Sequence, residues 1–320
     1  MNASTSPQAI AIRVQLFILS RDRKDYCRQA IVSALAQDYS NLEVVISDNS
    51  VGEDVAQMVT QEFPEVGLVR RIPSLPALEH FNRLIEEAQA PLMVLFHDDD
   101  VLEPSYISQM VEYHAQHPYA AAVGCNAYFM RHSKKTSSKL MGDFAGRRIL
   151  KSKSEFVEPY LSLSLIDPAP FPGYMYRTDI IRGLRLDSTK GGKHADVSFL
   201  CEVLDRAPIV WTDECLFNYR LHGANDSQRE SIGQRLSWLR YIQSAAGLSR
   251  TSQPVRDYKF MYWRRWLNQN SPGLPPFRRA TDSANFRIAV ARRFVVFWGL
   301  RLALTRIDFW KRTIRQLLRK

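Results

Sequence analysis

The first 130 residues alternate short apolar runs with stretches that carry a helical pattern, and this alternation restricts the fold more than any other feature. Residues 27–35 and 78–88 have apolar side chains at the i, i+3, i+4 and i+7 spacing of a helix face. Strands that alternate with helices form parallel sheets covered by helices on both faces. The sequence therefore predicts an α/β fold with strands at Val14–Leu19, Leu42–Ser47, Val66–Arg70, Leu92–His97 and Ala120–Met130.

Polar residues follow three of these predicted strands at the point where each strand ends. Ser20 and Arg21 follow the first strand, Asp48 follows the second, and Asp98–Asp100 follow the fourth. The carboxyl ends of parallel strands meet at one edge of the sheet, where ligands bind in such folds. We therefore expect these side chains to converge on one ligand.

The three consecutive aspartates, Asp98, Asp99 and Asp100, are the strongest candidate site. Adjacent carboxylates repel one another unless a cation or a dedicated partner compensates their charge. Oxygen ligands suit Mg²⁺ or Mn²⁺, which proteins usually share with substrate phosphates. The alternative is a solvated acidic turn that binds nothing. We predict a divalent-cation site at this position and a structural or supporting role for His97 beside it.

Beyond residue 130 the pattern becomes less regular. Residues 131–157 are polar and basic, which indicates a connecting loop. Residues 158–225 contain a helix candidate at Asp196–Asp205 and a short strand near Ile209–Trp211. This part of the chain does not repeat the alternation of the first 130 residues.

These patterns divide the chain into two predicted parts. Residues 1–225 are expected to form one domain, with halves at about 12–130 and 131–225. Residues 226–320 are mostly helical in pattern and are expected to form a C-terminal region.

The positive charge of the chain is concentrated at its C-terminal end. The formal net charge is +10, and residues 286–320 alone contain ten basic residues and one acidic residue, Asp308. Apolar residues between 300 and 318 fall on one helical face with arginines beside it. Such a basic amphipathic helix, with Trp and Phe, is typical of segments that bind anionic membranes. The alternative is a helix packed on the main domain. No recognition motif accompanies the charge, so we expect no nucleic-acid partner.

The cysteines and the N-terminal sequence indicate a cytoplasmic protein. The four cysteines form no CxxC pair or zinc-ligand spacing, as expected of reduced thiols. No basic residue precedes Arg13, and the apolar core of a signal peptide is absent. Together with the basic tail, these features predict a peripheral location at the inner face of the plasma membrane.

Several short motifs occur in the order found in one enzyme family. They are the opening strand with Ser20-Arg21, Val-Val-Ile-Ser-Asp-Asn-Ser at 44–50, Leu-Phe-His-Asp-Asp-Asp at 95–100, Phe-Pro-Gly-Tyr-Met-Tyr-Arg at 171–177, His-Ala-Asp at 194–196 and Asn-Tyr-Arg-Leu-His-Gly-Ala-Asn at 218–225. Over about residues 12–225 the sequence resembles glycosyltransferase family 2, of the type that builds bacterial surface glycans.

The resemblance implies a GT-A fold, in which a mostly parallel, Rossmann-like sheet is flanked by helices. It also implies transfer of a sugar from a nucleotide-sugar donor, such as a UDP- or dTDP-sugar, to a glycan or lipid-linked glycan acceptor. Residues 12–130 would then bind the nucleotide and residues 131–225 the acceptor. Mn²⁺ or Mg²⁺ would be the cofactor.

The family assigns the donor site to the acidic triplet and its surroundings. Asp98 and Asp99 would bind the sugar-nucleotide diphosphate. Asp98 and Asp100 would hold the metal, which His222 would approach from the C-terminal side. On its own, a histidine such as His222 is more often a hydrogen-bonded structural residue.

A pocket for the nucleotide base is implied at the ends of the first two strands. Asp48 would contact the base, and Ser20 and Arg21 would line the same pocket. The family often has Asp-Asp-Gly-Ser where this chain has Ser-Asp-Asn-Ser at 47–50, which weakens the assignment of Asp48.

Asp196 matches the catalytic base of the family. An acceptor hydroxyl becomes a good nucleophile when a base takes its proton. One carboxylate on the face opposite the leaving group suffices, and direct displacement then inverts the anomeric centre, as in the opposite-face chemistry of inverting glycosidases. Ala195 stands where the family often has Glu. The alternative is that Asp196 only caps the following apolar helix.

Two other functions compete with sugar transfer. A sugar nucleotidylyltransferase also uses an α/β domain and Mg²⁺, but its glycine-rich loop after the first strand has no counterpart at residues 20–23. A non-catalytic membrane-associated protein with a decayed transferase domain is the third possibility. The intact carboxylates at Asp98–Asp100 and Asp196 argue against that reading.

Overall fold

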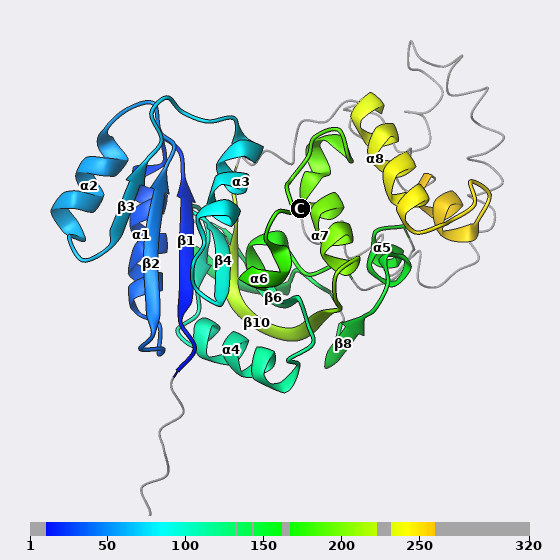
Figure 1. Ribbon diagram of the computed structural model, residues 1–320, viewed down its shortest axis with the longest axis horizontal. Helices are drawn as coiled ribbons and strands as arrows, with labels where there is room; N and C mark the ends of the chain where they lie inside the picture. Colours follow the sequence, from blue (N-terminus) through cyan, green and yellow to red (C-terminus); the bar gives the residue numbers. More distant parts are fainter. Residues whose placement is uncertain (1–10, 132, 143, 162–166, 223–231, 260–320) are drawn as a thin grey trace, which may run out of the picture.

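A computed structural model describes residues 11–131, 133–142, 144–161, 167–222 and 232–259 (Figure 1). The strands are β1 (Val14–Ser20), β2 (Leu42–Asp48), β3 (Gly67–Arg70), β4 (Leu92–His97), β5 (Val101–Leu102), β6 (Ala122–Arg131), β7 (Lys134–Lys139), β8 (Arg147–Leu150), β9 (Tyr174–Arg177) and β10 (Ile209–Leu221). The α-helices are α1 (Lys24–Leu35), α2 (Asp54–Glu62), α3 (Ala77–Glu87), α4 (Tyr106–Gln116), α5 (Lys153–Leu161), α6 (Thr178–Ile181), α7 (Ala195–Leu204) and α8 (Ile232–Ala245). Two short 3₁₀ turns, η1 (Phe171–Gly173) and η2 (Gly192–His194), precede β9 and α7.

The strands form one sheet in the order β3–β2–β1–β4–β9–β6–β10–β5, with β7 added to β6 and β8 added to β10. The long pairings, β3–β2–β1–β4 and β6–β10, are parallel. The short pairings, including both pairings of β9, are antiparallel. The predicted α/β class with a mostly parallel sheet is therefore confirmed, and the sheet is mixed rather than wholly parallel.

Alternate residues of the central strands pack on opposite faces of the sheet. Leu16 and Ile18 of β1 belong to the core formed with α1, α2 and α4, whereas Phe17 and Leu19 belong to the core formed with α3, α5 and α7. This is the period of two expected of a strand. All of β1 is buried, because helices cover both faces. The polar residues at the strand ends are thus held on a rigid frame.

The five strands predicted in the first 130 residues agree with the structure to within two residues at their ends. The helical stripes at 27–35 and 78–88 correspond to α1 and α3. The helix predicted at Asp196–Asp205 corresponds to α7. The sequence prediction omitted α2, whose nine residues carry only a short apolar stripe.

The prediction of a connecting loop at residues 131–157 is wrong. This segment contains β7, β8 and the start of α5. The strand β7 has the sequence Lys-Lys-Thr-Ser-Ser-Lys and is mostly exposed, so it shows no apolar alternation. Its backbone nevertheless pairs with the edge of β6. A strand held by backbone pairing alone leaves no periodic signal in its side chains.

The prediction of a short strand near Ile209–Trp211 is correct in position but too short, because β10 runs from Ile209 to Leu221. Its register against β6 shifts between Trp211 and Cys215 and again between Cys215 and Phe217. These irregularities surround the charged pair Asp213-Glu214, which interrupts the apolar run in the sequence. The continuation of β10 matters for the site, because it ends beside the loop that follows β4.

The described part of the C-terminal region packs on the sheet-covering helices. Trp238, Leu239 and Ile242 of α8 and the later Val255 are buried in the same core as α5 and α7. Figure 1 places α8 at the opposite end of the molecule from α2. The basic segment predicted to bind membranes lies in residues 260–320, outside the described residues. Among the helices that the structure describes, none combines the length and apolar character needed to cross a bilayer.

Candidate active site

The ends of β1, β2 and β4 lie side by side at one edge of the sheet. The pairing register sets Ser20 opposite Asp48 and Leu19 opposite His97. The acidic triplet begins at the next residue of the chain. The register therefore confirms that these strand ends meet at one edge of the sheet, while a ligand shared by their side chains stays a prediction.

Asp98 joins the end of β1 to the acidic loop. Its Oδ2 accepts hydrogen bonds from the Ser20 hydroxyl at 2.9 Å and from the Arg21 backbone N–H at 3.1 Å. Burial raises the pKa of Asp98 to about 6, and the nearby charge of Arg23 opposes part of this rise. Burial disfavours a charged carboxylate, whereas hydrogen bonds and positive neighbours favour it. One oxygen of Asp98 is thus already held by two donors.

Asp99 is held by two basic side chains at a single oxygen. Arg23 Nη1 lies 2.6 Å from Asp99 Oδ2, and His222 Nε2 lies 2.8 Å from the same atom. Burial alone would raise the pKa of Asp99, but the combined effect of His97, His222 and Arg23 outweighs burial and lowers it. Asp99 is therefore the member of the triplet in which the charged form is most favoured.

Asp100 is almost completely buried, with 1% of its surface exposed. Its Oδ1 accepts the backbone N–H of Arg220 at 2.8 Å. Its Oδ2 has no hydrogen-bond partner among the described residues. Burial, reinforced by the charge of Asp99, holds the pKa of Asp100 well above its usual range. A buried carboxylate oxygen without a partner is costly, and a bound cation would remove that cost.

The geometry assembles a group of possible metal ligands around His97. One ligand atom each from His97, Asp99 and Asp100 lie within 4.8 Å of one another. A nitrogen and two carboxylate oxygens fit Mn²⁺ well and Mg²⁺ less well, because Mg²⁺ prefers oxygen ligands. The set predicted from the family was Asp98, Asp100 and His222. In the structure Asp98 turns toward β1, and His222 contacts Asp99. The cluster therefore contains Asp99 in place of Asp98 and His97 in place of His222. The metal ligands themselves stay a prediction.

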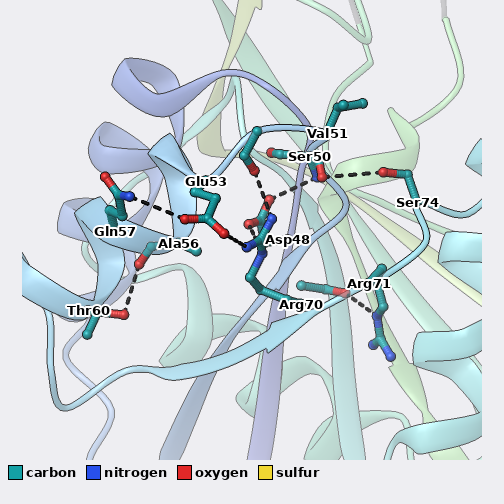
Figure 2. Close-up of polar contacts among 12 residues, drawn as sticks. Asp48, Ser50, Val51, Glu53, Ala56, Gln57, Thr60, Arg70, Arg71 and Ser74 are labelled. Atoms are coloured by element: carbon teal, nitrogen blue, oxygen red, sulfur yellow. Dashed lines mark hydrogen bonds and ion pairs between the residues drawn. The ribbon is translucent and has the colours of Figure 1, made fainter.

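Asp48 is fully buried at the end of β2, where one oxygen accepts a hydrogen bond and the other makes only an ion-pair contact (Figure 2). Oδ1 accepts the backbone N–H of Ser50 at 3.0 Å, and Oδ2 lies 3.4 Å from Arg70 Nε. Arg70 also contacts Glu53 at 3.3 Å and donates to the Gly52 carbonyl at 2.8 Å. These contacts hold the carboxylate in one position at the end of β2. Its contact with a nucleotide base stays a prediction.

The loop after β1 is tied to the loop after β2 next to this carboxylate. Asp22 has a positive φ of 55°, which turns the chain sharply. Its N–H donates to the Ser50 hydroxyl at 2.8 Å, and its Oδ1 accepts the Val51 N–H at 3.0 Å. The Arg21 side chain is half exposed and lies 3.8 Å from Asp22. Arg21 therefore contributes its backbone to the site, while its guanidinium faces outward.

Asp196 occupies the second position of α7, after the N-cap residue His194. Asp196 is therefore not the N-cap residue itself, and its carboxylate interacts with the backbone N–H groups of Asp196 and Val197 in the first turn. Burial raises the pKa of Asp196, and the positive charges of His194 and His97 oppose that rise. Because His97 also acts on Asp99, the candidate base and the acidic loop share one electrostatic neighbour.

The turn that leads into Asp196 rests on α8. The rings of His194 and Trp238 have centroids 5.2 Å apart. A Cβ at Gly191, whose φ is +95°, would lie 3.4 Å from Trp238 Cδ1 and 3.2 Å from the His194 carbonyl oxygen. Only glycine suits this position, because the turn combines a left-handed backbone with close packing. The helix α8 thus supports the turn that carries the candidate base.

Sequence reasoning missed Arg23 and Arg220. Arg220 donates from Nε to the Asp99 carbonyl at 2.7 Å and from Nη2 to Gln29 at 2.7 Å, and it stacks on Tyr26 with 4.6 Å to the ring centroid. Its neighbour His222 in the Tyr-Arg-Leu-His motif was a signal that could have identified it. Arg23 offered no such signal, because an arginine before a helix is common.

Comparison with known proteins agrees with this geometry. A family model described as glycosyltransferase like family 2 matches residues 12–155. The uncharacterized glycosyltransferase alr2836 of Nostoc sp. is 22% identical over 258 residues, which cover 77% of this chain and 76% of the relative. The resemblance to family 2 that the motifs indicated is confirmed.

Solved structures show the same fold. TarS of S. aureus (residues 1–349), in complex with UDP-GlcNAc, has a TM-score of 0.59 at 14% identity, covering 82% of this chain and 76% of that one. The mannosyltransferase PcManGT of Pyrobaculum calidifontis, in complex with GDP-Man and Mn²⁺, has a TM-score of 0.51 at 12% identity, covering 97% and 88%. The fold of this chain is therefore the α/β fold of GT-A glycosyltransferases.

Proposed function

We propose that this family 2 glycosyltransferase moves a hexosyl or deoxyhexosyl unit from a UDP- or dTDP-sugar to a glycan or lipid-linked glycan acceptor, with inversion at the anomeric carbon. The observation that carries the proposal is the assembly at one sheet edge. There, Ser20, Asp48 and the acidic triplet lie together, and Asp100 keeps a buried oxygen without a hydrogen-bond partner among the described residues. Surface polysaccharide synthesis is the process we expect it to serve.

The donor would bind across the ends of β1, β2 and β4. Asp48 and Ser20 would face the nucleoside, and Asp98 and Asp99 would face the diphosphate. The nucleotide-sugar complexes of TarS and PcManGT support a donor of this class, because both proteins share the fold. A ligand at the carboxyl edge of the sheet also follows the general rule for open α/β sheets.

His97, Asp99 and Asp100 would hold the divalent cation, since their ligand atoms already lie within 4.8 Å of one another. When bound, the cation would stabilise the negative charge that develops on the departing diphosphate. The protein's own part is to orient the carboxylates. Arg220 fixes Asp100 and the backbone of Asp99, and His222 holds a side-chain oxygen of Asp99.

Asp196 would act on the acceptor. Its carboxylate would take the proton of the acceptor hydroxyl as that oxygen forms a bond to the anomeric carbon. The bond from this carbon to the diphosphate oxygen breaks on the opposite face, so the configuration inverts. A positioned base of this kind contributes about 10²- to 10⁴-fold to the rate.

A panel of nucleotide sugars tests the proposal directly. Melting temperatures of the chain would be measured with UDP-, dTDP- and GDP-sugars, each in Mn²⁺ and in EDTA. Ligand at about 100 times its Kd should add about 2.7 kcal/mol to the free energy of unfolding. We expect stabilisation by a UDP- or dTDP-sugar only when Mn²⁺ is present.

Two other results would favour the competing functions. Release of pyrophosphate from a nucleoside triphosphate and sugar phosphate would identify a nucleotidylyltransferase. The absence of stabilisation by any nucleotide sugar would support a non-catalytic protein.

Removal of residues 300–320 should release the protein from anionic vesicles. In sequence the segment combines an apolar stripe with basic residues, and each Lys or Arg near a charged membrane adds about 1 kcal/mol of attraction. Co-sedimentation with vesicles of anionic and of neutral lipid measures the effect. Binding of the full chain should weaken at high salt, because added salt screens the attraction between the basic residues and the anionic lipid. This screening already acts beyond about 8 Å at physiological ionic strength, and its range shortens as salt is added.

The truncated chain must also keep its folded core. We expect an unchanged melting temperature and unchanged transfer to a soluble acceptor analogue. Salt-insensitive binding to neutral vesicles, or unfolding after truncation, would assign these residues to the core and remove the membrane from the proposal.

A further inference from the structure

We propose that Arg23 competes with the divalent cation for Asp99 and, when displaced, binds the diphosphate of the donor, so that it couples metal binding to nucleotide binding. The inference rests on the metal and donor sites of the proposed function. It adds a role for a residue that lies outside the sequence motifs quoted above.

A single nitrogen of Arg23 bridges two members of the acidic triplet. Nη1 lies 2.6 Å from Asp99 Oδ2 and 3.2 Å from Asp98 Oδ1. Contacts this short between a guanidinium and a carboxylate are charge-assisted hydrogen bonds, which are stronger than neutral ones. Arg23 therefore compensates part of the negative charge of the loop.

A divalent cation would need the same carboxylate. Asp99 is one of the three residues whose ligand atoms lie within 4.8 Å of one another. A metal ion approaches a carboxylate oxygen to about 2.0–2.2 Å, which is closer than the guanidinium nitrogen lies. Two cations on one carboxylate would also repel each other at short range. Metal binding and the contact between Arg23 and Asp99 therefore oppose each other.

Arg23 can leave this position, whereas Arg220 is fixed. The Arg220 side chain is 3% exposed and is held by the Asp99 carbonyl and by Gln29. The Arg23 side chain is 36% exposed. Its backbone is anchored at the start of α1, where its carbonyl accepts the N–H of Cys27 at 2.9 Å. A long side chain on a fixed backbone can swing without any change in the fold.

The diphosphate is the partner that a displaced Arg23 would find. In the proposed function the diphosphate lies at the same loop, beside Asp98 and Asp99. The planar fork of a guanidinium binds two phosphate oxygens at once, which suits arginine better than lysine. When the metal binds the Asp99 carboxylate, the diphosphate of the nucleotide would thus replace it as the anionic partner of Arg23.

This exchange has a thermodynamic consequence. Without nucleotide, Arg23 weakens metal binding, because the metal must displace it. With nucleotide, Arg23 gains the diphosphate, and the metal binds more tightly. By linkage, the metal must raise the affinity for the nucleotide by the same factor.

The test is a titration of the full chain with Mn²⁺, followed by the electron paramagnetic resonance signal of free Mn²⁺, without UDP and with saturating UDP. Wild type would be compared with Arg23→Gln and Arg23→Lys. Lys24→Gln is the matched control, because it removes the same charge from the exposed residue next to Arg23, to which no role in the site is assigned. Melting curves in EDTA would show that each variant is folded.

In Arg23→Gln we expect Mn²⁺ to bind about tenfold more tightly than in wild type when UDP is absent, a factor within the range typical of coupled sites. UDP should then raise the Mn²⁺ affinity about tenfold less than it does in wild type. Arg23→Lys should keep the competition but lose part of the coupling, since it keeps the charge without the fork. Lys24→Gln should match wild type in the titrations without and with UDP.

Weaker Mn²⁺ binding by Arg23→Gln without UDP would overturn the inference, because Arg23 would then assist the metal. An unchanged effect of UDP in this variant would also overturn it. If wild type binds no Mn²⁺ with or without UDP, the metal site of the proposed function fails, which is a separate result.

Discussion

Replacing Asp196 with asparagine should lower kcat by roughly 10²- to 10⁴-fold, the usual contribution of a positioned general base, while the affinity for the donor stays the same. Asparagine keeps the size of the side chain but cannot take the proton of the acceptor. The measurement is steady-state sugar transfer, with calorimetric titration of the donor as the binding readout. Transfer at a near wild-type rate would show that Asp196 has no catalytic role.

The pH profile gives a second readout for Asp196. Because burial raises the pKa of this carboxyl, its charged form is lost at a higher pH than for an exposed aspartate, whose pKa is about 3.9. The rate should therefore rise with pH as Asp196 loses its proton, and this rise should disappear in Asp196→Asn. Asp205→Asn, the same change at the other end of α7, should behave like wild type. A rise that persists in Asp196→Asn would belong to another group.

Asp100→Asn should lower the Mn²⁺-dependent affinity for UDP by about 100-fold or more, since residues that merely orient metal ligands already contribute about 10- to 100-fold. Asparagine retains an oxygen that can accept the Arg220 N–H, but it lacks the charge that attracts a cation. Calorimetric titration with UDP in Mn²⁺ and in EDTA measures the effect.

The melting temperature separates this effect from a loss of folding. Burial disfavours the charged form of Asp100, so its neutral replacement should melt at the same temperature or higher in EDTA. Asp54→Asn, at an exposed position in the first turn of α2, should leave both affinity and melting unchanged. Equal UDP affinity of Asp100→Asn and wild type in Mn²⁺ would remove Asp100 from the metal site.

The first half of the fold was predictable because burial on two faces leaves a clear record in the sequence. The strand β4 is an almost continuous apolar run, and α1 and α3 carry one apolar stripe each. Such patterns are strong because each misplaced residue would expose apolar surface or bury a polar group. The edge strand β7 obeys no such requirement, which is why it was missed.

The candidate site was predictable only in its anchoring residues. Ser20 and the acidic triplet lie at strand ends, and parallel topology alone brings strand ends together. Arg23 and Arg220 come into the site through the start of α1 and the irregular strand β10. Their positions depend on side-chain direction and on a shifted register, and neither can be read from residue spacing.

The link between Arg220 and Asp100 also has a consequence for synthesis on the ribosome. The two residues are 120 positions apart in the chain. At translation rates of about 5–20 residues per second, the acidic loop emerges about 6–24 s before the strand that stabilises it. The β3–β2–β1–β4 half can pair from the first 97 residues, whereas β6 must wait for β10, its main parallel partner. Until then, the sheet of a nascent chain is incomplete, and Asp100 in the acidic loop lacks the hydrogen bond from the backbone of β10.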